Sequence, residues 1–209
     1  MIRFKRNQIE QAISGVVSSR VREPEELRNR IKRLLDTDRS AGRSVRAIDP
    51  ERSNYAFYSG DSPGSGVEVW FSEYEAFAIL TGLRLLGHGW PQSLVVSMMR
   101  RIRADLEKEH SHMLTLDPKK LFDEAEILRN ARPGGMAFDV TTPVLLVIVS
   151  KPGAEPHALV VRRGADEAMK FLGTESRGGG AGTMFELAGV AHRLAQKLAE
   201  TEPSRRGRG

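Results

Sequence analysis

The longest regular pattern of hydrophobic and polar positions in this 209-residue chain lies between residues 67 and 106. Its first part, Val67–Phe71, is rich in valine and aromatic residues and predicts a strand. The next stretch, 73–86, is apolar at nearly every position, which predicts a helix buried on all sides. Ser72 and Glu75 stand at the spacing of a capping box, so we expect this helix to begin directly after Ser72.

A second helix is expected in the same stretch, after a tight turn. Gly89 predicts the turn, because glycine adopts the left-handed conformation at low cost, and Pro91 predicts the start of the next helix. Residues spaced three and four apart divide this helix into two faces. The apolar face holds Leu94, Val95, Met98, Ile102 and Leu106, and the face expected to point outward holds Arg100, Arg101, Arg103 and Lys108.

Two helices are predicted near the N-terminus. The apolar spacing within Asn7–Val17 is typical of a short amphipathic helix. A second helix is expected to begin at Pro24, a residue favoured at the first helical position, and to end within residues 36–40. Its apolar stripe comprises Leu27, Ile31, Leu34 and Leu35.

The segment that follows these helices predicts a loop and then a hairpin. Residues 41–54 show no clear period. Tyr55–Tyr58 and Val67–Phe71 are short runs of β-type residues on either side of a stretch rich in glycine, Gly60–Gly66. Two such runs around a glycine-rich turn predict a β-hairpin.

The C-terminal half predicts a small module of strands and helices. The apolar run at 143–150 has the length of a buried strand. Residues 174–182 are mostly glycine and polar residues and predict a flexible linker. Thr183 and Glu186 match a second capping box. The expected elements are a helix starting at Asp117-Pro118, strands at 143–150 and 158–161, a helix at 165–172 and a helix starting at Thr183.

Charge and composition narrow the class of protein. Residues 1–52 hold 13 Lys and Arg against 8 Asp and Glu, whereas the whole chain has a net charge of only +5. Such a positive segment attracts polyanions, although it is also compatible with a plain solvated surface. The absence of cysteine excludes disulfides and thiolate metal sites and fits a reducing compartment. The N-terminus lacks the apolar core of a signal peptide, so we expect a cytoplasmic protein.

The stretch Val67–Leu106 resembles the wing and the last two helices of MerR-type winged helix-turn-helix domains. The entry resembles Phe71–Glu75, and the apolar pattern and turn glycine correspond to Ile79, Leu83, Leu86, Gly89 and Leu94. The resemblance covers about forty residues and implies a DNA-binding transcriptional regulator. Upstream the chain departs from that family, because a long segment, 37–54, precedes the wing. Either residues 41–54 are an insertion, or the N-terminal half is a different winged-helix variant.

Basic side chains are the candidate DNA contacts. Our first choice is the basic face of the second helix, because arginine can donate to guanine edges and to phosphates. The alternative for every one of these residues is a solvated basic surface. The first set is Arg28, Arg30, Lys32 and Arg33, and the supporting set is Lys5, Arg6, Arg20, Arg22, Arg100, Arg101 and Arg103.

Other chemistries have weaker support in the sequence. His110 and His112 are two residues apart, which points them to different faces of a helix, so we expect no metal site there. The glycine-rich stretch 177–183 lacks the Gly-Lys-Ser/Thr ending of a phosphate-binding loop. We therefore expect no cofactor and no enzymatic activity.

Together these patterns predict an α+β protein. We expect a winged-helix DNA-binding domain over residues 1–115, a small α+β dimerisation or effector module over 116–200 and a disordered basic tail over 201–209. The predicted function is sequence-specific binding of double-stranded DNA by a homodimer, as a regulator of transcription or an accessory factor of a mobile element. The alternative is a non-catalytic adaptor that uses the same helices to dock a protein.

Overall fold

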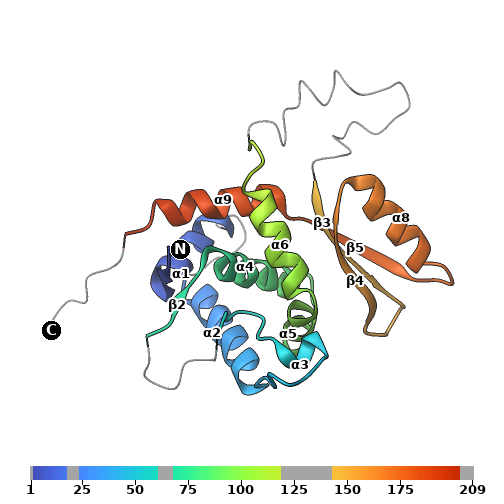
Figure 1. The fold of residues 1–209 in the computed structure, drawn as a ribbon, viewed down its shortest axis with the longest axis horizontal. Coiled ribbons are helices and arrows are strands. Elements are labelled where there is room, and N and C mark those ends of the chain that lie inside the picture. The colour runs from blue at the N-terminus through green and yellow to red at the C-terminus, as the bar shows by residue number, and fades with distance from the viewer. Residues whose placement is uncertain (1, 18–23, 61–67, 119–142, 203–209) are drawn as a thin grey trace. The chain divides into compact units, whose positions relative to one another are not determined.

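The computed structural model describes residues 2–17, 24–60, 68–118 and 143–202, which form helices and two small antiparallel sheets (Figure 1). The predicted α+β class is confirmed. The chain divides into two compact units: unit 1 comprises Met1–Glu107 with Arg193–Gly209, and unit 2 comprises Lys108–His192. No described helix combines the length and the apolar character that crossing a membrane requires.

The boundaries between the units fall inside two helices. The first lies within α6 (Arg103–Met113) and the second within α9 (Ala188–Ala199). The first unit is therefore discontinuous in sequence, since the end of α9 belongs to it. This division differs from the one predicted at residues 115 and 200, because sequence patterns within one helix do not show which core each end joins.

Unit 1 is built around four of the predicted helices. They are α1 (Arg6–Val17), α2 (Pro24–Ser40), α4 (Glu73–Gly87) and α5 (Gln92–Arg101). The predicted apolar stripes point inward: α2 buries all four of its stripe residues, and α4 is buried on nearly every side. The largest fully buried side chains of this core are Phe57, Phe71, Phe77, Ile9, Ile13, Ile31, Leu34, Ile79, Leu80, Leu85, Met98 and Met99.

The start of α4 confirms the predicted capping box. The Ser72 hydroxyl accepts a hydrogen bond from the Glu75 amide at 3.1 Å, and the Glu75 carboxylate accepts one from the Ser72 amide at 2.6 Å. Further along α4, a Cβ atom on Gly82 would lie only 2.9 Å from a methyl group of Leu34. Glycine at this position lets α2 approach α4 closely.

The predicted hairpin of Tyr55–Tyr58 with Val67–Phe71 is wrong. The partner of β2 (Trp70–Phe71) is β1 (Phe4–Lys5), and Tyr55–Tyr58 forms no strand. Two amide groups of this segment, those of Ala56 and Phe57, donate instead to the buried carboxylate of Asp38 at 3.1 and 3.0 Å. A side-chain acceptor thus replaces the strand partner that the pattern suggested.

Unit 2 contains a three-stranded antiparallel sheet in the order β4-β3-β5. The predicted strands are confirmed as β3 (Val144–Ser150) and β4 (Pro156–Arg163), and the predicted helix as α8 (Ala165–Glu175). On one face, Val147 and Val149 of β3 pack with α8. The pleat explains this arrangement, since alternate residues of a strand share a face.

The third strand occupies a stretch where the sequence predicted a linker and a cap. Residues 174–182 are not a flexible linker, because α8 extends to Glu175 and β5 (Ala181–Glu186) begins six residues later. Gly178 and Gly179 have φ angles of 89° and 94°, which fit a tight turn. The second predicted capping box is also wrong, because Thr183 lies in β5. The helix that follows is α9 (Ala188–Ala199), and the carboxylate of Glu186, just before it, accepts a hydrogen bond from the Gly189 amide.

Two further predictions lie outside the described residues. The helix expected from Asp117-Pro118 falls almost entirely on 119–142, and most of the tail expected over 201–209 falls on 203–209.

Candidate nucleic-acid interface

The middle of α2 presents an uninterrupted basic surface. Between Leu27 and Leu35 the helix carries four cations and no acidic residue, and all four cationic side chains are exposed. At 100° per residue, Lys32 and Arg33 stand on either side of the direction opposite the buried stripe. Of the acidic residues of the helix, Glu25 and Glu26 lie in the first turn, the exposed Asp36 lies one turn after Lys32 and pairs with Arg39, and Asp38 is buried.

Two of these cations are paired, but weakly. Arg28 Nε lies 3.3 Å from Glu10 Oε2, and Arg30 Nε lies 3.3 Å from Glu26 Oε1. The two arginine side chains are 63% and 45% exposed, and ion pairs of this kind contribute about 0–1 kcal/mol. Lys32 and Arg33 form no ion pair with any described residue. All four side chains can therefore meet an external anion at little cost.

The N-terminal cations occupy a different setting. The Arg6 guanidinium donates to Glu10 Oε1 at 2.7 Å and to the Arg28 backbone oxygen at 3.4 Å. Lys5 pairs with Glu68 at 3.0 Å, and its ammonium lies 5.1 Å from the centre of the Trp70 ring. Arg6 therefore lies next to α2, whereas Lys5 of β1 contacts Trp70 of β2 and the nearby Glu68. The remaining predicted contacts of this segment, Arg20 and Arg22, lie outside the described residues.

The prediction that Arg100 points outward is wrong, because its side chain is only 4% exposed. Its Nε donates to Asp38 Oδ1 at 2.7 Å, and one terminal nitrogen donates to the Asp38 backbone oxygen. The other terminal nitrogen donates to the backbone oxygens of Gly42 and Glu51 at 2.8 and 3.3 Å. Arg100 therefore ties together both ends of the segment that follows α2.

Arg103 is also buried, at 7% exposure, and was wrongly expected on the surface. Its guanidinium donates to the Tyr55 backbone oxygen at 2.7 Å and to that of Ala56 at 3.2 Å, and it lies over the Tyr74 ring. Backbone oxygens of an irregular segment need donors, and a guanidinium supplies five. Of the predicted cluster at 100–103, only Arg101 is exposed.

One sequence signal could have revealed the buried pair. Asp38 falls on the apolar stripe of α2, four residues after Leu34, and is fully buried. A carboxylate at such a position needs a buried cation or several donors, because an uncompensated buried charge is very costly. Here the two amides and Arg100 together meet that need.

Sequence reasoning missed the cations of the loop between α2 and α3 (Pro50–Ser53). Arg43 and Arg46 lie in this loop and Arg52 lies in α3 directly after it; Arg46 and Arg52 are exposed. The loop is closed by a hydrogen bond from the Ser44 amide to the Arg52 backbone oxygen at 2.8 Å. Because the segment has no hydrophobic period, its sequence predicts only a loop and does not indicate which of its side chains share a surface.

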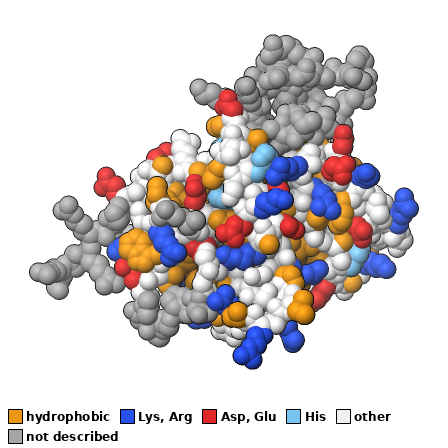
Figure 2. Space-filling model, in the orientation of Figure 1, with side chains coloured by type: hydrophobic (Ala, Val, Ile, Leu, Met, Phe, Trp, Pro, Cys, Tyr) orange, Lys and Arg blue, Asp and Glu red, His pale blue; other side chains and the backbone are white. Residues whose placement is uncertain are grey.

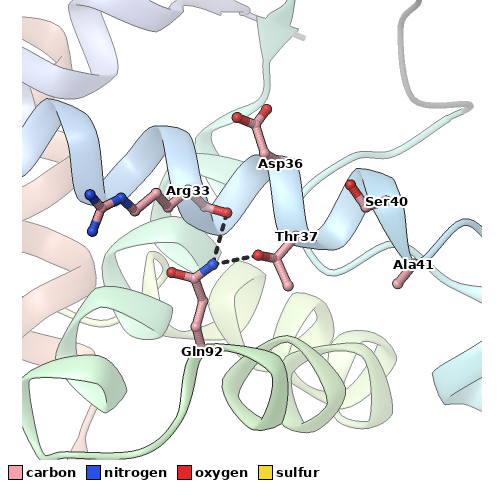
Figure 3. Close-up of a pocket in the computed structure, with 6 residues that line it drawn as sticks. All are labelled: Arg33, Asp36, Thr37, Ser40, Ala41 and Gln92. Carbon is pink, nitrogen blue, oxygen red and sulfur yellow. Dashed lines mark hydrogen bonds between the residues drawn. The ribbon is translucent and has the colours of Figure 1, made fainter.

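Two hollows join α2 to this loop. The first, of about 520 Å³, is lined by Arg33, Asp36, Thr37, Ser40, Ala41 and Gln92 (Figure 3). In it the Gln92 amide group donates to the Arg33 backbone oxygen at 3.2 Å and to the Thr37 hydroxyl, while the Arg33 guanidinium points away from Gln92. The second, of about 500 Å³, is lined by Ala41, Gly42, Arg43, Ser44, Ala47, Glu51, Arg52 and Arg100.

Ala41 lines both hollows, and together their linings extend from Arg33 on α2 to Arg52 in α3. Lys and Arg side chains lie along the lower edge of Figure 2, where Figure 1 places the end of α2 and the segment leading to α3. The linings combine arginines and hydroxyl groups with two acidic residues, Asp36 in the first hollow and Glu51 in the second. Such an arrangement suits the binding of phosphate oxygens.

The histidines and carboxylates of α6 do not form a metal site. Within the described ranges, no group of three or more His, Cys, Asp or Glu side chains is placed to hold an ion. His110 is buried at 4% exposure, and burial lowers the pKa of its imidazole to about 4, with a further contribution from nearby His192. Glu109 pairs with Arg163 of β4 at 2.5 Å. His110 thus belongs to the interior of unit 2, whereas the pair of Glu109 with Arg163 lies at its surface.

Comparison with models of protein families, with curated proteins and with solved structures gives no match to this chain.

Proposed function

We propose that unit 1 binds double-stranded DNA through the exposed face of α2. The observation that carries this proposal is the run of four exposed cations on α2, two of which, Lys32 and Arg33, have no ion pair among the described residues. A surface of this kind releases counterions from DNA when it meets the phosphates, and that release supplies most of non-specific affinity.

The mechanism follows from the geometry of the helix. The positive face steers the protein to the duplex, and arginine side chains projecting from one helix can reach guanine edges in the major groove. Phosphate contacts fix the orientation of the helix, whereas base contacts give sequence preference. Two copies of the chain, paired through unit 2 or α9, would place two such helices on successive half-sites.

The proposal keeps the MerR-type resemblance only in part. The order of α4, the Gly89 turn and α5 supports it, with Gly89 in a left-handed conformation at φ 90°. A wing has no support, since Tyr55–Tyr58 is not a strand. DNA binding by a transcriptional regulator therefore rests here on α2 and not on a wing.

A second candidate is an adaptor that binds an acidic protein surface. The pairing of Arg28 with Glu10 and of Arg30 with Glu26 favours it, because these arginines already bind carboxylates, the groups that an acidic protein surface offers. Salt dependence separates the two candidates. A protein interface of ordinary size derives much of its stability from apolar burial, whereas DNA affinity falls steeply with salt.

The test is fluorescence-anisotropy binding of the full chain to a labelled random duplex between about 50 and 200 mM salt. We expect the logarithm of the binding constant to fall linearly with the logarithm of salt concentration, by about 0.9 for each phosphate contacted. A preference of about 10³-fold or more for DNA upstream of the protein's own reading frame would identify a sequence-specific regulator. Absence of binding at about 50 mM salt would overturn the proposal and leave the adaptor as the better candidate.

A further inference from the structure

The loop between α2 and α3 exposes two large aliphatic side chains. Val45 is 77% exposed and Ile48 is fully exposed. They are three residues apart, with Arg46 between them, and both lie between Arg43 and Arg52. Single exposed apolar residues are common on proteins, but two at the tip of one basic loop form a distinct feature.

Hydrogen bonds from the buried Arg100 hold the loop in place. Arg100 donates to the backbone oxygens of Gly42 and Glu51, one near each end of the loop, and is itself anchored on Asp38. The Ser44 amide bonds to the Arg52 backbone oxygen, and the Arg43 guanidinium lies over the Tyr55 ring. The aliphatic side chains are therefore presented by a preorganised base, which lowers the entropic cost of binding.

The small size of this exposed apolar surface decides which class of partner it fits. Full burial of two such side chains contributes about 3–6 kcal/mol, less than the single acyl chain that gives only marginal membrane binding. A stable protein interface needs about 800 Å² on each partner, far more than two side chains provide. Insertion beside or between base pairs needs only one or two apolar side chains with cations next to them.

The charges of the loop fit the same partner. Arg43, Arg46 and Arg52 outnumber the acidic residues Asp49 and Glu51, and the Asp49 carboxylate accepts from the Glu51 amide. Arg46 and Arg52 are exposed and form no ion pair with a described residue.

We infer that residues 42–52, which are the loop together with most of the short helix α3, form a second DNA-contacting element. In it Ile48 and Val45 wedge against a base step, while Arg46 and Arg52 contact phosphates on either side of that step. The inference rests on the proposed function, since the loop continues the α2 surface through the two hollows that share Ala41. A wedge of this kind unstacks the step and bends the duplex. The loop thus adds sensitivity to DNA deformability to the contacts made by α2.

The experiment compares the full chain with its Ile48→Ala variant on one duplex that carries end labels for energy transfer and 2-aminopurine at central steps. For the parent chain we expect a bend of about 20–90° and increased 2-aminopurine fluorescence. Ile48→Ala is expected to lose both signals and about tenfold in affinity. Its unfolding midpoint should stay unchanged, because the side chain is fully exposed. The matched control is Met169→Ala, which removes an exposed apolar side chain of unit 2 and should leave binding and bending unaltered.

The outcomes separate the wedge from DNA binding itself. If the parent chain does not bind the duplex, the proposed function fails and the wedge with it. If the parent binds but Ile48→Ala binds and bends the duplex equally well, the wedge alone is refuted. Co-sedimentation with phosphatidylserine vesicles that is lost in Ile48→Ala, with DNA binding intact, would overturn the wedge in favour of a lipid surface.

Discussion

Two arginine-rich stretches of unit 1, 28–33 and 100–103, look alike in sequence and have opposite environments. Each lies on or beside a helix whose apolar residues recur at helical spacing. The four cations of the first stretch are exposed, whereas Arg100 and Arg103 of the second are buried among backbone oxygens. The number of positive charges does not distinguish a binding surface from an internal tie.

The difference comes from what each helix packs against. On the exposed face of α2, the side chains of Lys32 and Arg33 form no ion pair with any residue that the structure describes. The end of α5 lies beneath an irregular segment whose backbone oxygens have no strand or helix to satisfy them, and Arg100 and Arg103 fill that need. Arginine serves here because its planar group donates several hydrogen bonds at once.

The largest expected effect tests the internal tie. Arg100→Ala should reduce the free energy of unfolding by about 3–5 kcal/mol, because it leaves the Asp38 carboxylate buried without its cation. Arg101→Ala removes a neighbouring arginine that is exposed, and should change stability by less than about 0.5 kcal/mol. Chemical denaturation followed by circular dichroism measures both. Equal effects of the two variants would contradict the assignment of Arg100 to the interior.

Unit 2 extends the comparison to a titratable group, because it buries the imidazole of His110 near a second imidazole, that of His192. The lowered pKa of His110, about 4, means that the folded state keeps this imidazole neutral while the unfolded chain binds a proton below about pH 6.5. The contribution of His110 to the free energy of unfolding is therefore fully present above pH 6.5. It is lost as the pH decreases from 6.5 towards 4, by up to about 3 kcal/mol.

Denaturation of the parent chain at several pH values measures this loss. His110→Gln should flatten the dependence between pH 6.5 and 4, whereas the exposed His88→Gln should preserve it. A parent chain equally stable at both ends of this interval would refute the buried neutral imidazole.

Arg103 offers a milder test of burial than Arg100. Its ionic neighbour, Glu107, is 48% exposed and can be hydrated when Arg103 is lost. We expect Arg103→Ala to cost about 2 kcal/mol, mainly from its hydrogen bonds to the Tyr55 and Ala56 oxygens. Lys108→Ala, an exposed site on the same helix, is the control in thermal unfolding. A loss larger than that of Arg100→Ala would reverse the order proposed for the two ties.

The smallest effect on stability is expected on α2. Lys32→Ala and Arg33→Ala should each change the free energy of unfolding by less than about 0.5 kcal/mol, since neither side chain is paired or buried. Urea denaturation is the measurement. Destabilisation above about 1 kcal/mol would mean that these cations hold the fold and are not free for a ligand.

Local patterns were sufficient where structure is determined locally. The helical spacing of α1 and α2, the Ser72–Glu75 cap and the apolar run of β3 all predicted elements that the structure contains. Each depends on residues within a few positions of one another. The exposure of Arg28–Arg33 also followed from the stripe of α2.

Long-range pairing could not be predicted in the same way. The partner of Trp70–Phe71 comes from the N-terminus, and the amides of Ala56 and Phe57 bond to a carboxylate of α2. The glycines before β5 suggested a linker, because nothing in their own sequence shows that β3 offers an open edge to the next residues. The burial of Arg100 has the same origin, with Asp38 as its one sequence signal.

The most direct test of the central claim, that the face of α2 binds DNA, removes two positive charges either from α2 or from unit 2. Salt-dependent DNA binding would be compared for Lys32→Ala/Arg33→Ala and for Lys151→Ala/Lys170→Ala, which removes two exposed cations of unit 2. The α2 variant is predicted to weaken binding and to reduce the magnitude of the salt slope by about 2, whereas the unit 2 variant should match the parent chain. Equal slopes for the two variants would contradict DNA binding by the face of α2.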